Sequence, residues 1–233
     1  MKKDYAIPGL FNNNAQALRL TQLTILQRER SKPHLTRKFY HCLMGLICFS
    51  LYAFLLTQVQ AILVMLVVGG GIVILDIGRF YSSKLKELSL RYFGWLMRRN
   101  ELKGLTANSY FVLGIFITLL FFPKPVTLMS VLFLAIGDPV AAIFGSLYGR
   151  TPLLGKKSLE GTLANFVICC LVGLVMGVFF FKLSPETAPL FAISCGVIAA
   201  LSEMLPSTLD DNLVIPTASA VLLSVANHYA MFF

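Results

Sequence analysis

Long apolar runs alternate with short polar segments along most of the chain. Runs of about 20 apolar residues cross a bilayer as helices, because a helix satisfies its own backbone hydrogen bonds in lipid. Several of the runs here are shorter than that or are interrupted. The pattern predicts seven spans, at about residues 39–57, 60–77, 107–122, 126–146, 159–181, 188–205 and 213–232. The expected fold class is therefore all-α, a polytopic integral membrane protein with about seven transmembrane helices.

Two further segments have a helical pattern without the apolar content of a span. Residues 80–103 interleave apolar side chains such as Leu85 with basic ones such as Lys86 and Arg91. This pattern is typical of an amphipathic helix that lies in the headgroup layer. Residues 14–30 show a weaker form of it, for which an ordinary solvated helix is an equal alternative. One or two interfacial helices are therefore expected beside the spans.

Composition and charge narrow the class of protein further. The chain is 57% apolar and 13% charged, whereas a soluble domain carries about 25% charged residues. The net charge of +9 also occurs in proteins that bind nucleic acid, but these basic residues lie between apolar runs. We therefore expect membrane lipids as partners and no nucleic acid. A basic N-terminal segment, 1–38, precedes an expected membrane-embedded domain, 39–233.

The basic residues also predict an orientation. Of the 20 Lys and Arg residues, 18 precede the first span or lie in the 78–106 and 147–158 loops. Only Lys124 and Lys182 lie on the other side. Cytoplasmic loops carry the excess of Lys and Arg. The N-terminal segment is therefore expected to be cytoplasmic, in a bacterial inner membrane or an endoplasmic reticulum membrane.

Ionisable residues recur inside the spans or at their ends, where lipid makes them costly and usually functional. By the expected topology, all of them face the cytoplasmic half. They are Arg37, Lys38, His41, Asp76, Asp138, Lys156, Lys157, Glu160, Glu203, Asp210 and Asp211. Carboxylates bind divalent cations, and cationic side chains neutralise phosphates. The cluster therefore predicts a site for a metal-bound polyphosphate.

Most of these residues also have a plain structural interpretation. Asp138 and Pro139 would form a simple helix break if the aspartate capped the following turn. Lys156 and Lys157 are also what the positive-inside rule places in a cytoplasmic loop. His41 is more often a packed histidine than a catalyst. Helix N-terminal charges or solvated turns would account for Glu160, Asp210 and Asp211.

A Gly-Lys-Lys-Ser segment at 155–158 follows Gly149 at a spacing close to that of a phosphate-binding P-loop. It has one residue too many between the glycines, and it follows a membrane helix rather than a strand, which excludes that fold. The local physics is shared, because backbone N–H groups, ammonium groups and a hydroxyl all bind phosphate. Gly145 and Gly149 are explained either by close helix contacts or by close backbone approach to a nucleotide.

These residues carry a family resemblance. Residues 138–149, Asp-x-x-Ala-x-x-x-Gly-x-x-Tyr-Gly, and 155–162, Gly-Lys-Lys-Ser-x-x-Gly-Thr, resemble the signature of the CTP-dependent lipid kinases, which include dolichol, phytol and diacylglycerol kinases. Three further motifs resemble the same family: Arg37-Lys38 with His41, Asp76-x-x-Arg79-Phe80, and Glu203-x-Leu205-Pro206 followed by Asp210-Asp211-Asn212. The motifs keep their order over about residues 36–220. Pro139 departs from the other branches, which carry different small residues there.

The resemblance implies CTP as phosphate donor, Mg²⁺ as cofactor and the hydroxyl of a lipid alcohol, of diacylglycerol or polyprenol type, as acceptor. It implies catalytic roles for Asp138, Lys156, Lys157 and Asp211. Nucleotide contacts are implied for Arg37, Lys38, Gly145, Gly149, Lys156, Lys157 and Ser158. Asp138 is assigned to Mg²⁺, and Asp210, with Asp211 as the alternative, is assigned to a second metal ion. Asp76 and Arg79 form either a structural ion pair or part of the catalytic site.

Two rival functions remain open on sequence grounds. Phosphatidate cytidylyltransferases are similar around the glycine-rich turn, but their long C-terminal signature is absent here. A small-solute transporter would also place charges on broken helices, near the bilayer midplane and often in paired halves. The polar residues here gather on one side, which favours the kinase. The sequence does not reveal the lipid alcohol or the oligomeric state.

Overall fold

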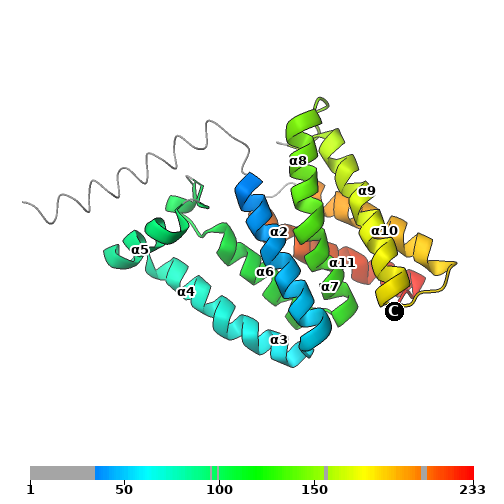
Figure 1. The fold of residues 1–233 in the computed structure, drawn as a ribbon, viewed down its shortest axis with the longest axis horizontal. Helices are drawn as coiled ribbons and strands as arrows, with labels where there is room; N and C mark the ends of the chain where they lie inside the picture. The colour runs from blue at the N-terminus through cyan, green and yellow to red at the C-terminus, as the bar shows by residue number, and fades with distance from the viewer. Residues whose placement is uncertain (1–34, 95, 99, 155–156, 206–208) are drawn as a thin grey trace, which may run out of the picture. The chain divides into compact units, whose positions relative to one another are not determined.

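The described part of the chain is helical. The computed structural model describes residues 35–94, 96–98, 100–154, 157–205 and 209–233, and within them an isolated bridge between Pro152 and Ser158 is the only β-type pairing. The α-helices are α2 Leu35–Ser50, α3 Gln58–Val64, α4 Gly70–Gly78, α5 Ser83–Phe93, α6 Ala107–Phe121, α7 Lys124–Leu132, α8 Asp138–Tyr148, α9 Leu159–Val175, α10 Thr187–Met204 and α11 Asp211–Ala230 (Figure 1). The π-helical turns are η1 Leu51–Leu55, η2 Met65–Gly69, η4 Phe133–Gly137 and η5 Met176–Phe180, and η3 Asn100–Leu102 is a 3₁₀ turn. The expected all-α class is confirmed.

Several of these elements join into helices long enough to cross a membrane. Within the described residues there are six, at Thr36–Leu55, Gln58–Gly78, Lys124–Tyr148, Leu159–Phe180, Thr187–Met204 and Asp211–Ala230. Helix α6 covers the remaining predicted span and is apolar, but it has 15 residues. The protein is therefore polytopic, as the apolar runs predict. The predicted helix at 14–30 lies outside the described residues.

The chain divides into two compact units, and the larger one comprises Leu35–Val73 and Ala107–Phe233. Its centre is the span Lys124–Tyr148, which is 78% buried over its most apolar stretch, against 17% for the span Thr36–Leu55. Helices α2, α6 and α11 pack against α7, and α9 packs against both η4 and α8 (Figure 1). The side chains of the central span are therefore surrounded mainly by protein and not by lipid.

Small residues bring the surrounding helices close to this central span. A Cβ atom on Gly45 of α2 would lie 2.6 Å from the Cβ of Ala135 in η4. A Cβ atom on Gly137 would overlap the side-chain oxygen of Asn165 in α9. In membranes such small residues let helix backbones approach closely. Both crossings lie within one helical turn before Asp138, so they hold α2 and α9 close to it.

The central span continues through Asp138 and Pro139 without a break. Asp138 has helical backbone angles, φ −61° and ψ −45°, and no side-chain cap begins α8. A proline removes one backbone N–H and crowds the turn before it, and the π turn Phe133–Gly137 lies at that position. The interpretation of Asp138 as a helix cap is therefore wrong.

The smaller unit includes residues 74–106, and a buried ion pair organises it. Arg79 Nε donates to Asp76 Oδ1 at 2.6 Å, and its Nη2 donates to the carbonyl oxygens of Glu101, at 2.6 Å, and Gly104. The backbone N–H and hydroxyl of Thr106 both donate to Asp76 Oδ2. Of the two alternatives for Asp76 and Arg79, the structural ion pair is present.

Helix α5, Ser83–Phe93, occupies part of the segment 80–103 in which an amphipathic helix was expected. Ser82 caps its first turn, and Leu90 is buried while Leu88 and Tyr92 are exposed. The helix is shorter than the segment, because the chain turns at Gly94. Its place in the headgroup layer remains a prediction.

Candidate active site

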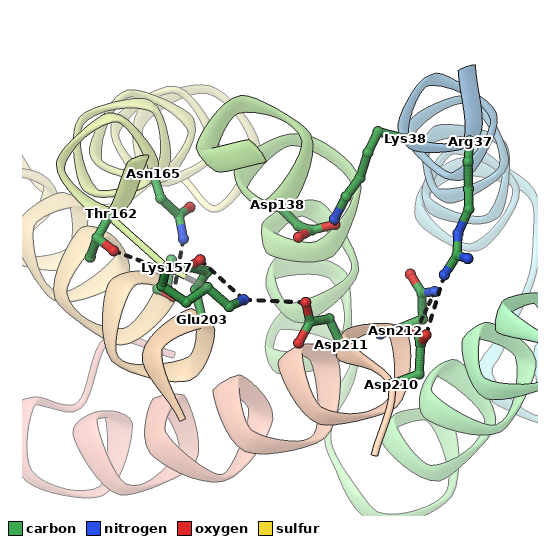
Figure 2. Close-up of polar contacts among 11 residues, drawn as sticks. Arg37, Lys38, Asp138, Lys157, Thr162, Asn165, Glu203, Asp210, Asp211 and Asn212 are labelled. Carbon is green, nitrogen blue, oxygen red and sulfur yellow. Dashed lines mark hydrogen bonds and ion pairs between the residues drawn. The ribbon is translucent and has the colours of Figure 1, made fainter. Parts of the chain in front are cut away.

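Two adjacent cations at the start of α2 reach two different acidic residues. Arg37 Nη2 lies 3.2 Å from Asp210 Oδ2, and Lys38 Nζ forms an ion pair with Asp138 Oδ2 (Figure 2). Neighbouring residues on a helix project about 100° apart, so the two side chains diverge. Both pairs are largely buried, and Asp138 is 4% exposed. The start of α2 is thus joined by charge to α8 and to the start of α11.

Lys157 precedes α9 and connects two more carboxylates. Its Nζ lies 3.1 Å from Glu203 Oε1, near the end of α10, and 3.2 Å from Asp211 Oδ2 in the first turn of α11 (Figure 2). Burial by itself lowers the pKa of an ammonium group. Here the carboxylates of Asp211, Glu203 and Asp138 outweigh burial and raise the pKa of Lys157 above its usual value. Lys157 is therefore a permanent cation at neutral pH.

Helix capping fixes the loop residues that complete this cluster. Asp210 is the N-cap of α11, where its Oδ1 accepts from the backbone N–H of Asn212 at 3.1 Å and from its side-chain amide at 2.6 Å. Ser158 is the N-cap of α9 and accepts from the N–H of Gly161 at 3.2 Å. Carboxylates and hydroxyls at these positions satisfy the free N–H groups of a helix start. The sequences Asp210-Asp211-Asn212 and Ser158-Leu159-Glu160 therefore begin helices as well as supplying polar groups.

A polar chain along one face of α9 extends the cluster. The hydroxyl of Thr162 donates to Glu203 Oε2 at 3.0 Å, and the side-chain amide of Asn165 donates to the carbonyl of Ala199 at 3.3 Å (Figure 2). The thiol of Cys169 donates to Asn165 Oδ1 at 3.2 Å. The sequence prediction did not assign roles to these residues. The signal was available, because Asn165 is a polar residue inside an apolar span and shares a helix face with Thr162 and Cys169.

His41 lies one turn after Arg37 and Lys38 and is buried, with 3% exposure. Its ring centroid lies 5.6 Å from that of Phe111 and 5.5 Å from that of Tyr40. Its Nδ1 atom has no hydrogen-bond partner within the described part of the chain. The aromatic contacts agree with the packed histidine that the sequence favoured.

The structure places the remaining predicted residues in different ways. A Cβ atom on Gly145 or Gly149 would lie 3.0 or 2.8 Å from the hydroxyl oxygen of Ser158, so both glycines allow α8 to pack closely against the start of α9. Glu160 accepts hydrogen bonds from the backbone N–H of Thr151 at 3.1 and 3.3 Å. The predicted Lys156 lies outside the described residues. The nucleotide contacts of Gly145, Gly149 and Ser158 remain predictions.

The carboxylates are compatible with a magnesium ion that is shared with a nucleotide. Within the described ranges, no group of three or more His, Cys, Asp or Glu side chains gathers in a form that could hold a metal by itself. Mg²⁺ is usually bound by one or two carboxylates, with substrate phosphates and waters as its other ligands. Asp138 and Asp210 supply such carboxylates beside cations that suit phosphate. The donor set fits a metal that arrives with the nucleotide.

Comparisons with known proteins identify three similar fungal proteins. The chain is 35% identical over 164 residues to CTP-dependent diacylglycerol kinase 1 of Schizosaccharomyces pombe, covering 64% of this chain and 72% of the relative. It is 31% identical over 213 residues to the protein of that name from Saccharomyces cerevisiae, covering 83% and 73%. The Eremothecium gossypii protein of that name is 29% identical over 212 residues, covering 83% and 67%. No family model and no solved structure matches the chain.

Proposed function

The chain belongs to the family of CTP-dependent lipid kinases, and on that premise we propose that it transfers the γ-phosphoryl group of CTP to the hydroxyl of diacylglycerol. The names of the three fungal relatives support both the donor and the acceptor. Diacylglycerol is therefore preferred to a polyprenol such as dolichol.

The observation that carries the proposal is the convergence of opposite charges at one set of helix ends. The cations Arg37, Lys38 and Lys157 come from the start of α2 and from the segment before α9, and their partners lie on α8, α10 and α11. A nucleoside triphosphate is a polyanion that needs several cations around it. The acidic partners hold these cations in position before the nucleotide arrives. Positioning and charge neutralisation are most of what phosphoryl transfer requires.

Asp211 is the proposed proton acceptor. Its side chain is 43% exposed, against 5% for Asp138 and 13% for Asp210, so it offers the most room for an entering hydroxyl. The lipid hydroxyl gives its proton to the Asp211 carboxylate as its oxygen forms a bond to the γ-phosphorus. The bond between the γ-phosphorus and the bridging oxygen breaks, and CDP leaves. Lys157, 3.2 Å from Asp211, is placed to neutralise charge on the transferred group.

Asp138 and Asp210 are the proposed ligands of Mg²⁺. A bound magnesium ion would neutralise charge on the phosphates and orient them for attack. The phosphates would then take over Lys38 and Arg37, which pair with the same two carboxylates in the free protein. Each ion pair would thus separate on binding, and its cation would contact phosphate while its carboxylate would bind the metal.

The site is proposed to face the cytoplasm, in a bacterial inner membrane or an endoplasmic reticulum membrane. The starts of α2, α9 and α11 and the end of α10 supply it, and 11 of the 20 Lys and Arg residues lie in residues 1–38 and 147–158, the segments that lead to α2 and α9. A lipid hydroxyl lies at the headgroup level, where cytosolic CTP can meet it. Residues 1–38 would then form a cytoplasmic segment, with residues 39–233 as the catalytic domain.

The test is phosphate transfer by the purified protein in mixed lipid. CTP and ATP, each with a labelled γ-phosphate, are supplied separately with Mg²⁺, and diacylglycerol, a polyprenol and phytol are offered as acceptors. We expect labelled phosphatidate from CTP, and its loss in Asp138→Asn. Glu160→Gln is the matched control, because it makes the same carboxylate-to-amide change at a side chain that contacts Thr151 instead of the ion pairs.

Two outcomes would contradict the proposal. Labelled polyprenol phosphate without phosphatidate would assign a different lipid alcohol. Absence of transfer to any lipid by folded protein would refute the activity itself.

A further inference from the structure

An apolar cavity lies in the larger unit, toward the end of the α2 span that is opposite the ion pairs. About 430 Å³ of empty space, part of which is open to the surroundings, lies between α2 with η1, α3 with η2, α6 and α7. Its lining is aliphatic, aromatic and sulfur-containing, apart from the hydroxyls of two residues, Tyr52 and Thr127. The lining includes Cys48, Tyr52, Ala61, Ile115, Leu119 and Val131. Nothing in the proposed reaction uses this space.

The depth of the cavity matches the length of a lipid chain. Along α2, Cys48 follows Lys38 by ten residues, which is about 15 Å of helix. Along the central span, Val131 precedes Asp138 by seven residues, or about 10 Å. One leaflet of hydrocarbon is about 15 Å thick, half of the bilayer core. A lipid whose hydroxyl lies at the Lys38–Asp138 pair therefore has chain ends that reach the near edge of the cavity, lined by Cys48 and Val131. The rest of the lining continues away from the ion pairs to Leu56 and Thr127, within reach of longer chains only.

The cavity borders the surface that faces lipid. Leu51 and Val64 line it, and these two side chains are 39% and 44% exposed. Both belong to predicted membrane spans, where an exposed apolar side chain contacts acyl chains. A chain can therefore enter sideways from the bilayer without passing through water.

We infer that this cavity holds the distal part of an acyl chain of the diacylglycerol substrate, an inference that rests on the proposed function. Surrounding lipid is as apolar as the lining, so transfer from water does not drive the occupancy. The chain gains packing contacts, and the seated chain fixes the depth of the hydroxyl at the ion pairs. The cavity should therefore favour long acyl chains over chains too short to reach it.

The inference predicts a change in chain-length preference when the cavity is filled. The purified protein is assayed with labelled CTP on dioctanoylglycerol and dioleoylglycerol. Ala61→Phe fills the cavity from a residue that is 5% exposed, and we expect the ratio of kcat/KM for the long chain to that for the short chain to fall about tenfold. Ala61→Val and Ala61→Leu should give smaller, graded falls.

Two control variants separate filling from general damage. Val67→Phe adds the same aromatic ring at a residue that is 72% exposed and does not line the cavity, so its ratio should equal that of the wild type. Tyr52→Phe removes a hydroxyl that has no hydrogen-bond partner among the described residues, and it leaves the cavity volume almost unchanged. An unchanged ratio in all three Ala61 variants, or an equal loss with both lipids, overturns the inference.

A measurement on the wild-type protein tests the same point without a substitution. A diacylglycerol that carries a diazirine at the end of one chain is photolysed with the protein in lipid. Label in segments 48–65 or 115–131 supports the inference, and label confined to other segments overturns it. Failure of the proposed function is distinguishable, because the wild type would then phosphorylate neither lipid.

Discussion

Two buried carboxylate–cation clusters in this molecule differ in how their charges are satisfied. Around Asp76 and Arg79, the partners are three to 30 residues apart, and backbone carbonyls and an N–H group occupy much of the bonding capacity. Around Asp138, Lys157 and Asp210, the ion pairs join side chains that are up to 173 residues apart. The hydrogen-bonding groups of the first cluster are satisfied by the nearby backbone of residues 101–106. The second offers carboxylate and ammonium groups that a ligand can exchange, which is what a site for a metal-bound nucleotide needs.

The largest expected effect is on turnover at the second cluster. Asp138→Asn removes the charge that holds Lys38 and that we assign to Mg²⁺, so kcat should fall by about 10²–10³-fold or more. The measurement is labelled phosphatidate formation at saturating CTP, with thermal melting as the check on folding. A variant that melts like the wild type and keeps near-normal turnover would remove the metal assignment.

Arg79→Ala tests the opposite expectation for the first cluster. Removing one partner leaves Asp76 buried without its counterion, so the free energy of unfolding should fall by about 3–5 kcal/mol. Denaturant or thermal unfolding in detergent measures the loss. Fractional activity per folded molecule should be retained, and Asp76→Asn combined with Arg79→Gln should recover part of the stability. Loss of turnover with normal melting would instead make Arg79 catalytic.

Lys157→Ala should weaken nucleotide binding by about 10- to 100-fold, because a charge-assisted contact to phosphate contributes about 1.5–3 kcal/mol. Lys156→Ala is expected to act in the same direction. Titration of CTP binding measures both variants, and Lys157→Arg should restore part of the affinity. Lys124→Ala is a suitable control, since Lys124 donates to the carbonyl of Leu56. Unchanged affinity in both variants would refute phosphate contact by these lysines.

The smallest expected effect is on the pH dependence of turnover, in which Lys157 should cause no change near neutral pH. The pKa of Lys157 is raised above its usual value near 10.5, so its stabilising ion pairs are fully present below that pH. They are lost only as the pH rises through the raised value. Turnover of the wild type and of Lys157→Arg between pH 7 and 9 should therefore follow parallel curves. A step in that range that Lys157→Arg abolishes would contradict a permanently charged Lys157.

Hydropathy predicted the helices well because lipid imposes a length and a polarity on every span. The fifth predicted span, 159–181, is found as Leu159–Phe180, and the second, 60–77, as Gln58–Gly78. The π turn before Asp138 was not predicted, since apolar periodicity says nothing about one extra residue in a turn. The short α6 shows a second limit, because the sequence predicts a span at 107–122, whereas the apolar helix found there has 15 residues and is shorter than the six candidate spans.

The candidate site was predicted as a set of residues but not as pairs. The free-energy cost of a charged side chain in lipid identifies Asp138 and Lys38 one at a time. Their pairing depends on how closely α2 crosses η4, at Gly45 and Ala135, which the sequence does not show. Asn165 was missed because an amide carries no formal charge, although its burial requires hydrogen bonds as much as an ion does. The interpretation of Asp138 as a cap failed for a local reason, since the π turn Phe133–Gly137 just before Asp138 and Pro139 keeps the helix continuous.

The ion pair between Arg37 and Asp210 also has a meaning during synthesis of the chain. Asp210 emerges 173 residues after Arg37, which at typical elongation rates is a delay of roughly 10–35 s. During that interval α2 enters the membrane with Arg37 lacking this carboxylate, and only the insertion of α11 supplies it. The closing of this ion pair thus requires the insertion of α11, so a chain that has not yet inserted α11 lacks one of the ion pairs of the candidate site.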